Sequence, residues 1–331
     1  MRKLLVIGKE ERVVTNSPDK SELEKYDITC FPMGTPDSEI IKRCGDTEYI
    51  IVDAMGSVSR EMILNMPKLK IIHSEGVGFQ GVDVKTAASK GVYVCNCKGM
   101  NATAVAEHAI LLMLGVLRNV IGCDKAVRAG KQITVKENFM LTGSLKELRE
   151  CTVGLIGFGD IAKAAAKLLN AFGSRILYYD VVRAPEAVEK ELHASNVGLD
   201  ELLEKSDIVS LHLPVFESTR HIANREFFSK MKRSSYLINT ARGELVDSEA
   251  LIDAISDGTI SGAGLDTIEG EPVRMDNKLL KAPKHVLNKI IFSCHIGGIT
   301  GASFSRGYGM VWADFEKVAN GERPGHVVNK I

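Results

Sequence analysis

Short apolar runs rich in β-branched residues alternate with amphipathic segments along the whole chain. The apolar runs lie at 3–8, 49–53, 69–74, 92–95, 152–157, 175–180, 207–212, 235–240, 260–266 and 289–294. Segments with helical spacing, such as 59–66 and 248–256, separate them. Strands and helices that alternate in this way form βαβ units, in which helices cover parallel sheets. With 331 residues, the chain is long enough for two doubly wound α/β domains.

The segment 101–130 departs from this alternation because apolar residues occupy most faces of the helix that it predicts. We expect one long, largely buried helix there. Its longest apolar run, 109–117, is well short of the ~20 residues that cross a bilayer, so we expect no membrane partner. Lysine plus arginine and aspartate plus glutamate number 42 each and form no basic run, so we expect no nucleic-acid partner.

The seven cysteines predict reduced thiols in the cytoplasm. They form no C-x-x-C pair, and the N-terminal residues MRKLLVIG resemble a strand rather than a signal peptide. Cys95 and Cys97 alternate along one predicted strand, but no second pair of ligands has the spacing of a zinc site. We therefore expect no metal site.

A glycine-rich turn indicates a dinucleotide cofactor. Gly157-x-Gly159-x-x-Ala162 follows an apolar strand and begins an alanine-rich helix. Gly157 permits a tight turn, and Gly159 lets the backbone approach a pyrophosphate at the helix N-terminus. Asp180 ends the next strand, where a carboxylate binds the adenosine ribose and repels a 2′-phosphate, so NAD is expected. Arg183 leaves NADP open, and a turn that only packs the βαβ unit is the alternative without a ligand.

Three later strands end in side chains that suit hydride transfer to a 2-keto acid. Arg242, Glu271 and His295 each follow a predicted strand. Ligands of parallel sheets bind beyond the carboxyl ends of the strands, so these loops should converge. An arginine fork holds a carboxylate, an imidazolium donates a proton to a carbonyl, and a carboxylate orients the ring. Taken singly, the three are also typical of a surface ion pair, a turn before Pro272 and a core histidine.

An ordered set of motifs resembles the D-isomer-specific 2-hydroxyacid dehydrogenases, a family that includes D-lactate dehydrogenases and glyoxylate/hydroxypyruvate reductases. The motifs are GVGFQGVDV (76–84), GMNATAVAEH (99–108), TVGLIGFGDIA (152–162), LHLPVFEST (211–219), NTARGELVD (239–247), GLDTIEGEP (264–272), HIGG (295–298) and NGERPGHVVN (320–329). The resemblance implies a Rossmann-like NAD-binding domain, 101–298, inserted into a flavodoxin-like substrate domain, 1–100 plus 299–331. It also implies a homodimer formed through the long helix after Asn101.

The resemblance assigns a role to each matching residue. Arg242 would orient the substrate, His295 would be the acid/base with Glu271 as its partner, and the amides of Val77 and Gly78 would hold the substrate carboxylate. The cofactor would contact Gly157, Gly159, Asp160, Ile161, Asp180, Leu213, Pro214, Thr219, Thr240, Ala241, Arg242, Asp266, His295 and Gly298. The implied reaction is reversible hydride transfer between NADH and a 2-keto acid, giving an (R)-2-hydroxy acid.

Some positions differ from the common pattern of the family. Gln80-Gly81 replaces an Asp/Asn pair, Cys294 replaces a proline, and the segment 125–140 lacks a tryptophan that many members carry. Asp160 places a negative charge beside the expected pyrophosphate unless it caps the helix. Substrate size stays open, although an apolar pocket would favour a branched or aromatic keto acid; its candidate residues are Met55, Val77, Phe79, Phe304, Tyr308 and Trp312.

Four alternatives remain open. A formate enzyme on this fold would carry Gln where Glu271 stands, which argues against formate dehydrogenase; a phosphite dehydrogenase is the related alternative. An NAD(H)-sensing corepressor would keep the same Arg, Glu and His but is expected to carry an interaction tail. A hydroxypyruvate or glyoxylate reductase that uses NADPH shares all the motifs. A Cys294 nucleophile or redox sensor would need to reach His295, but neighbouring strand residues point to opposite faces.

Overall fold

The computed structural model describes residues 1–331, which form two compact units. Unit 1 comprises Met1–Asn101 and Ile299–Ile331, and unit 2 comprises Ala102–Gly298. Each unit contains one parallel sheet, which agrees with the strand–helix alternation of the sequence. Most strands are buried on both faces, and this explains why they are apolar at nearly every position.

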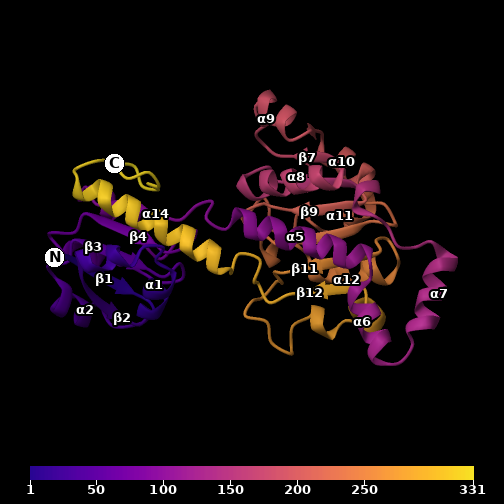
Figure 1. Cartoon of the computed structure of the whole chain (residues 1–331), viewed down its shortest axis with the longest axis horizontal. Helices are drawn as coiled ribbons and strands as arrows, with labels where there is room; N and C mark the ends of the chain where they lie inside the picture. Colours follow the sequence, from indigo (N-terminus) through magenta and orange to yellow (C-terminus); the bar gives the residue numbers. More distant parts are fainter. The chain divides into compact units, whose positions relative to one another are not determined.

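The sheet of unit 1 has the strand order β2-β1-β3-β4-β5, which is the flavodoxin-like order. Helices α1 and α14 pack on one face of this sheet, and α2, α3 and α4 pack on the other (Figure 1). The strands are β1 (Arg2–Ile7), β2 (Tyr26–Phe31), β3 (Tyr49–Val52), β4 (Ile71–Ser74) and β5 (Tyr93–Cys95). The helices are α1 (Glu10–Asn16), the 3₁₀ helix η1 (Lys20–Lys25), α2 (Asp37–Cys44), α3 (Arg60–Leu64), α4 (Val84–Ser89) and α14 (Gly301–Ala319).

The sheet of unit 2 has the order β12-β11-β10-β9-β6-β7-β8, a Rossmann-type order that reverses direction between β6 and β9. Its strands are β6 (Thr152–Ile156), β7 (Arg175–Tyr179), β8 (Ala194–Asn196), β9 (Ile208–Leu211), β10 (Tyr236–Asn239), β11 (Gly262–Leu265) and β12 (Ile290–Phe292). The carboxyl ends of β6, β10, β11 and β12 carry the residues that the sequence predicts for chemistry.

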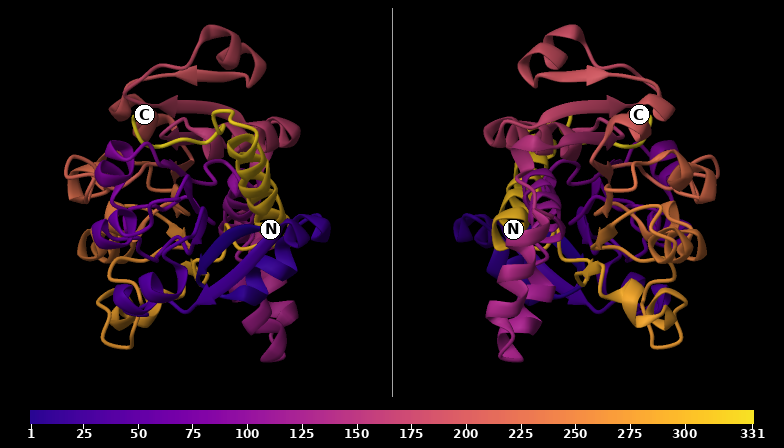
Figure 2. Two further views of the ribbon diagram at one scale, coloured as in Figure 1. Left: turned by 90° about the vertical axis from the view of Figure 1, so that its left-hand side faces the viewer. Right: turned by 90° about the vertical axis from the view of Figure 1, so that its right-hand side faces the viewer.

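Helices cover both faces of the second sheet. On one face lie α5 (Ala102–Leu117) and α8 (Asp160–Phe172), and on the other lie α10 (Leu199–Lys205), α11 (Arg225–Lys230) and α12 (Ser248–Ser256). Helix α9 (Glu186–Glu191) lies next to β8 at one edge (Figures 1 and 2). The remaining helices are α6 (Val120–Arg128), α7 (Gln132–Thr142), α13 (Lys284–Leu287), and the 3₁₀ helices η2 (Leu148–Glu150), η3 (Gly243–Leu245) and η4 (Leu279–Lys281).

Three details differ from the expectations. The apolar runs do not predict strands β2 and β8, because polar residues at exposed positions interrupt the apolar residues of both strands. The single helix expected over 101–130 is wrong, since Asn119 adopts a left-handed φ of 47° between α5 and α6. Strand β12 also ends at Phe292, two residues earlier than expected. No single helix is long and apolar enough to span a membrane, and only the bent pair α5–α6 meets the length and composition criteria together.

Candidate active site

His295 and Glu271 form a hydrogen-bonded pair in unit 2. His295 Nδ1 lies 2.6 Å from Glu271 Oε2, and the other carboxylate oxygen accepts the backbone N–H of Ile268 at 2.8 Å. A carboxylate that is held in this way binds one ring nitrogen and so sets the orientation of the imidazole. Because Nδ1 is occupied and the ring is 46% exposed, Nε2 is the nitrogen available to a ligand.

Asp266 holds the turn that carries His295. This buried carboxylate accepts hydrogen bonds from Ser293 Oγ at 2.6 Å, Ile296 N at 2.9 Å and Gly297 N at 2.8 Å, while its carbonyl accepts His295 N at 2.9 Å. Burial alone would raise the pKa of Asp266, but its hydrogen bonds, including one from His108, lower that pKa well below the usual range. The Asp266 side chain therefore positions the turn of His295, through a network that the sequence did not reveal.

The backbone of His295 is itself unusual. Its φ is 54°, in the left-handed region that residues with a Cβ rarely adopt. Such a conformation costs about 1–3 kcal/mol, so it persists only where the surroundings enforce it. The Asp266 hydrogen bonds on both sides of His295 provide that enforcement.

Arg242 follows β10 in a turn that Asn239 stabilises. Asn239 Nδ2 donates to the carbonyl of Arg242 at 2.8 Å, and Asn239 Oδ1 accepts the N–H of Ala241 at 3.0 Å. The guanidinium is exposed and donates only to the carbonyl of Ala241, at 2.7 Å. Since no carboxylate of the chain pairs with it, the Arg242 fork is free to bind an anionic ligand.

The glycine turn has the geometry that the sequence predicts. Gly157 has a φ of 86°, and a Cβ there would lie 2.8 Å from the carbonyl oxygen of His212. At Gly159, the N-cap residue of α8, no other atom lies within 4 Å of the point that a Cβ would occupy. This open space at a helix N-terminus fits a pyrophosphate, which the unpaired first-turn amides of Asp160 and Ile161 could bind. Gly159 is the N-cap residue and Asp160 is the first residue of the helix, so Asp160 does not cap α8.

The region after β7 distinguishes between the two nicotinamide cofactors. Asp180 Oδ2 accepts the N–H of Phe158 at 2.6 Å, which places the carboxylate against the glycine turn. Arg183 is engaged elsewhere, because its guanidinium forms a two-pronged ion pair with Glu189 at 2.8 and 2.9 Å. A 2′-phosphate would therefore meet the carboxylate of Asp180 and no free arginine from this segment.

The loop after β9 surrounds the other side of the glycine turn. Thr219 Oγ1 donates to the carbonyl of Pro214 at 2.8 Å and accepts the N–H of Phe216 at 2.7 Å, so it closes this loop. A methyl of Leu213 lies 3.0 Å from the point that a Cβ at Gly157 would occupy. His212 lies beneath the turn, and burial lowers the pKa of its imidazole to about 4.

The low pKa of His212 predicts acid sensitivity of folding. In the unfolded chain the imidazole titrates near 6.5, so between about pH 6.5 and pH 4 the unfolded state binds more protons and stability falls as the pH falls. The full shift corresponds to about 3 kcal/mol. Urea unfolding at about pH 7 and pH 4.5 should show a smaller loss of unfolding free energy for His212→Asn than for the wild type. An equal loss in both proteins would contradict this assignment.

Two threonines at the strand ends carry unsatisfied hydroxyls. Thr240 Oγ1 and Thr267 Oγ1 are buried without a hydrogen-bond partner in the chain. Buried polar groups normally have partners, so orphaned hydroxyls at the carboxyl ends of β10 and β11 suit a ligand with polar groups. Thr240 and its neighbour Ala241 are among the predicted cofactor residues, whereas Thr267 is not. Gly298 lies three residues beyond His295, at the end of unit 2.

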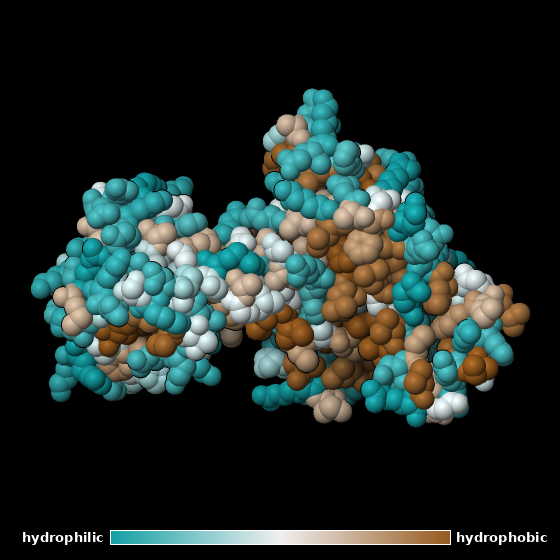
Figure 3. Space-filling model, viewed as in Figure 1, coloured by the Kyte–Doolittle hydropathy of each residue, from teal (hydrophilic) through white to brown (hydrophobic).

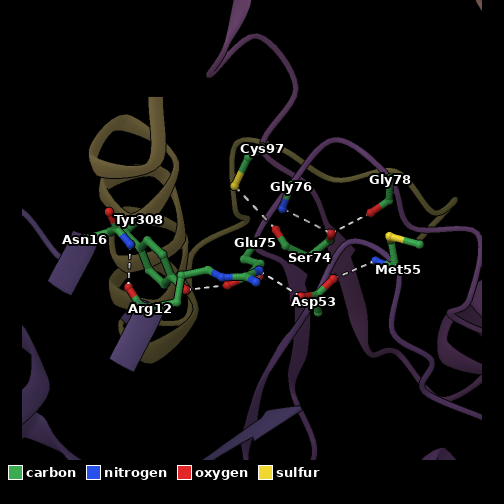
Figure 4. A network of polar contacts seen from close by, with 10 residues as sticks. All are labelled: Arg12, Asn16, Asp53, Met55, Ser74, Glu75, Gly76, Gly78, Cys97 and Tyr308. Atoms are coloured by element: carbon green, nitrogen blue, oxygen red, sulfur yellow. Dashed lines mark hydrogen bonds and ion pairs between the residues drawn. The ribbon is translucent and has the colours of Figure 1, made fainter. Parts of the chain in front are cut away.

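The predicted substrate loop lies in unit 1 and is held by a polar network (Figure 4). Arg12 pairs with Asp53 at 2.8 Å and with buried Glu75, which also accepts a hydrogen bond from Tyr308. The carbonyl of Val77 accepts Asn96 Nδ2 at 2.7 Å. Ser74 Oγ donates to the carbonyl of Gly78, whereas the amides of Val77 and Gly78 have no acceptor in the chain. Two free adjacent amides are suited to an anion such as a carboxylate.

Comparisons with known proteins identify the family. The family model for the NAD-binding domain of D-isomer-specific 2-hydroxyacid dehydrogenases matches residues 110–297. This chain belongs to that family. It is 36% identical over 309 residues to a glyoxylate reductase of Korarchaeum cryptofilum, covering 93% of this chain and 91% of the relative. It is 37% identical over 298 residues to a hydroxypyruvate reductase of Thermotoga maritima, covering 89% and 87%.

Solved structures of the same family share the fold. D-mandelate dehydrogenase of Rhodotorula graminis matches with a TM-score of 0.83 and 28% identity, covering 100% of this chain and 98% of that one. D-lactate dehydrogenase of Lactobacillus jensenii with NAD⁺ matches with a TM-score of 0.83 and 27% identity, covering 99% and 100%. The chain is accordingly an NAD-dependent oxidoreductase of the D-2-hydroxyacid dehydrogenase family. The corepressor alternative gains no support from these relatives.

Proposed function

We propose that His295, Glu271 and Arg242 perform the dehydrogenase reaction and that small 2-keto acids are the substrates. The observation that carries the assignment is the 2.6 Å bond between His295 and Glu271, which leaves Nε2 of an oriented imidazole free. Bound NADH supplies the hydride. His295 Nε2 donates the proton to the carbonyl oxygen and takes it back in the reverse direction, while Glu271 stabilises the imidazolium.

Arg242 would bind the substrate carboxylate and polarise the adjacent carbonyl, because its guanidinium is exposed and has no carboxylate partner in the chain. In unit 1, the free amides of Val77 and Gly78 are suited to a substrate carboxylate. We infer that residues 1–100 plus 299–331 form the substrate domain and residues 101–298 the NAD-binding domain. All seven cysteines are free, which supports a reducing, cytoplasmic location.

Glyoxylate and hydroxypyruvate are the proposed substrates. Eight relatives of similar sequence are glyoxylate or hydroxypyruvate reductases, and they align over about nine tenths of this chain. The alternative of an aromatic keto acid depends on six candidate residues for an apolar pocket, and two of them do not line a pocket. Tyr308 and Trp312 belong to the buried core of unit 1, where Trp312 Nε1 donates to Ser17 Oγ at 3.0 Å.

A substrate panel tests this proposal. NADH oxidation should be followed by absorbance with glyoxylate, hydroxypyruvate, pyruvate and phenylpyruvate at matched concentrations. We expect the highest kcat/KM with glyoxylate or hydroxypyruvate and (R) configuration in the chiral product of hydroxypyruvate. Preference for phenylpyruvate would refute the substrate assignment, and turnover that survives loss of His295 would refute the mechanism.

Cofactor preference provides a separate prediction. Glu189→Gln should release Arg183 and raise kcat/KM for NADPH relative to NADH by about tenfold, the effect of one added hydrogen bond to a charged group. Adding Asp180→Ala should increase the change further because it removes the repelling carboxylate. Glu186→Gln is the matched control, since Glu186 on the same helix pairs with Lys190 and not with Arg183. Equal cofactor ratios in the Glu189 and Glu186 variants would contradict this role.

A homodimer is also proposed. Exposed apolar side chains gather over helices α5, α6 and α7 (Figure 3), namely Leu111, Val120, Ile121, Val127, Ile133, Met140 and Leu141. A cavity of about 350 Å³ lies between α6 and α7. An apolar surface of this kind is typical of an interface. Sedimentation should give twice the chain mass, and Ile133→Glu with Leu141→Glu should shift it toward the monomer.

A further inference from the structure

Three potential metal ligands that are far apart in the sequence, His73, Asp314 and His326, meet inside unit 1, and none of them belongs to the candidate active site. His73 on β4 and Cys95 on β5 are partners in the parallel register, so their side chains lie on the same face of the sheet. Both side chains are fully buried. That face is covered by α14, which contributes Asp314.

The C-terminal segment brings the third residue of the cluster, His326. Val327 pairs antiparallel with Cys95, and Asn96 N donates to the carbonyl of His326 at 3.3 Å. This pairing places His326 Nδ1 2.8 Å from Asp314 Oδ2, and His73 Nε2 lies 3.2 Å from the same oxygen. The ligand atoms of His73, Asp314 and His326 all lie within 4.8 Å of one another. Cys95 lies beside His73 on the same face of the sheet, but its thiol is not among the atoms that lie within 4.8 Å of one another.

Both ring nitrogens of His73 face hydrogen-bond acceptors, and this arrangement calls for an additional proton or a metal ion. Nδ1 lies 2.8 Å from the carbonyl oxygen of Ser74, and Nε2 faces Asp314 Oδ2. Both partners are acceptors only, whereas a neutral imidazole has one donor and one acceptor nitrogen. If Nδ1–H donates to Ser74, the lone pair of Nε2 points at a carboxylate oxygen, and either a second proton or a metal ion must lie between them.

We propose that His73, Asp314 and His326 form a zinc-class divalent cation site, which Cys95 completes as a fourth ligand when the ion is bound. Two imidazoles, one carboxylate and one thiolate are the donor types that zinc prefers, and a magnesium or calcium site would be built from oxygen ligands. The bond from His73 Nδ1 to a backbone carbonyl is the outer contact that metal-binding histidines normally make. Gly325 N supports Asp314 in the same way, donating to Oδ1 at 2.7 Å.

The site has an entry path and a structural consequence. The His326 side chain is 35% exposed, so a cation can reach the buried ligands from that side. A bound ion would join β4, β5, α14 and the C-terminal segment, which are distant in sequence. We therefore expect the cation to stabilise unit 1 independently of the dehydrogenase reaction.

Zinc titration of the full chain tests the proposal. The protein is stripped with a chelator, and zinc is titrated in competition with a chromophoric chelator. We expect about one zinc per chain. His326→Gln should weaken zinc binding by at least about 100-fold, because loss of a residue that only supports a ligand weakens metal binding by up to about 100-fold. His285→Gln is the matched control, because His285 is exposed in unit 2 and bonds only Ser256. Zinc should raise the unfolding temperature of the wild type and the control but not that of His326→Gln.

A second measurement tests whether Cys95 binds the metal ion, and a turnover assay checks that the His326→Gln variant is folded. Cobalt(II) in place of zinc should give a thiolate-to-metal absorption band that disappears in Cys95→Ser, and its absence from the wild type would overturn the fourth ligand. Turnover of NADH should remain normal in His326→Gln, which shows that the variant is folded. Failure of the wild type to compete for zinc, or equal affinity in His326→Gln, would overturn the site.

Discussion

Replacement of His295 by alanine is expected to lower kcat about 10²–10⁴-fold with a small change in the KM of the keto acid, because general acid catalysis contributes to the transition state. The variant keeps Arg242 and the amides of Val77 and Gly78, which we propose hold the substrate carboxylate. Steady-state oxidation of saturating NADH by glyoxylate and hydroxypyruvate measures both constants.

Two variants control this experiment. Glu271→Gln keeps a hydrogen-bond acceptor beside Nδ1 but removes the negative charge that stabilises the imidazolium, so its loss of kcat should be smaller than that of His295→Ala. His285→Ala removes an exposed histidine of the same unit and should leave kcat unchanged. Near-normal turnover in His295→Ala would show that another group donates the proton.

Replacement of Arg242 by glutamine is expected to lower kcat/KM by roughly 10²–10³-fold. Removing one partner of a hydrogen-bonded charge pair costs about 2–5 kcal/mol, and here the other partner is the substrate carboxylate. The turn should survive, since Asn239 binds only the backbone of residues 241 and 242. The same NADH assay, with the keto acid varied over a wide concentration range, separates the changes in KM and kcat.

Arg242→Lys provides the matched comparison. Lysine keeps the positive charge but lacks the planar fork that binds a carboxylate through two parallel hydrogen bonds. Its kcat/KM should therefore lie between those of the wild type and Arg242→Gln. Wild-type activity in Arg242→Gln, together with an unchanged unfolding temperature, would exclude Arg242 from substrate binding.

Most of the fold was predictable because the strands are buried on both faces. Ten apolar runs correspond to strands of the structure, whereas β2 and β8 lack such runs because polar residues occupy their exposed positions. The break between α5 and α6 was missed because the apolar pattern continues through it. Only the left-handed backbone of Asn119 interrupts the helix, and a single asparagine within a helical pattern does not predict a helix break.

The candidate site was predictable where local chemistry determines it. The Gly157 turn needs a positive φ and a nearby Asp180, and both requirements appear as short motifs. The supporting residues were missed because their partners are distant in sequence. His108 bonds Ser293 at 2.8 Å across 185 positions, and Ser293 in turn bonds Asp266.

The sequence by itself determined the two parallel α/β domains, the dinucleotide turn and the Arg–Glu–His set, because each depends on residues that are close together or on a repeated apolar period. Only the tertiary structure decided which partners those residues find. It paired Arg183 with Glu189 and brought His73, Asp314 and His326 together beside Cys95. Distances between side chains on different strands depend on register and packing, and residue spacing along the chain does not encode them.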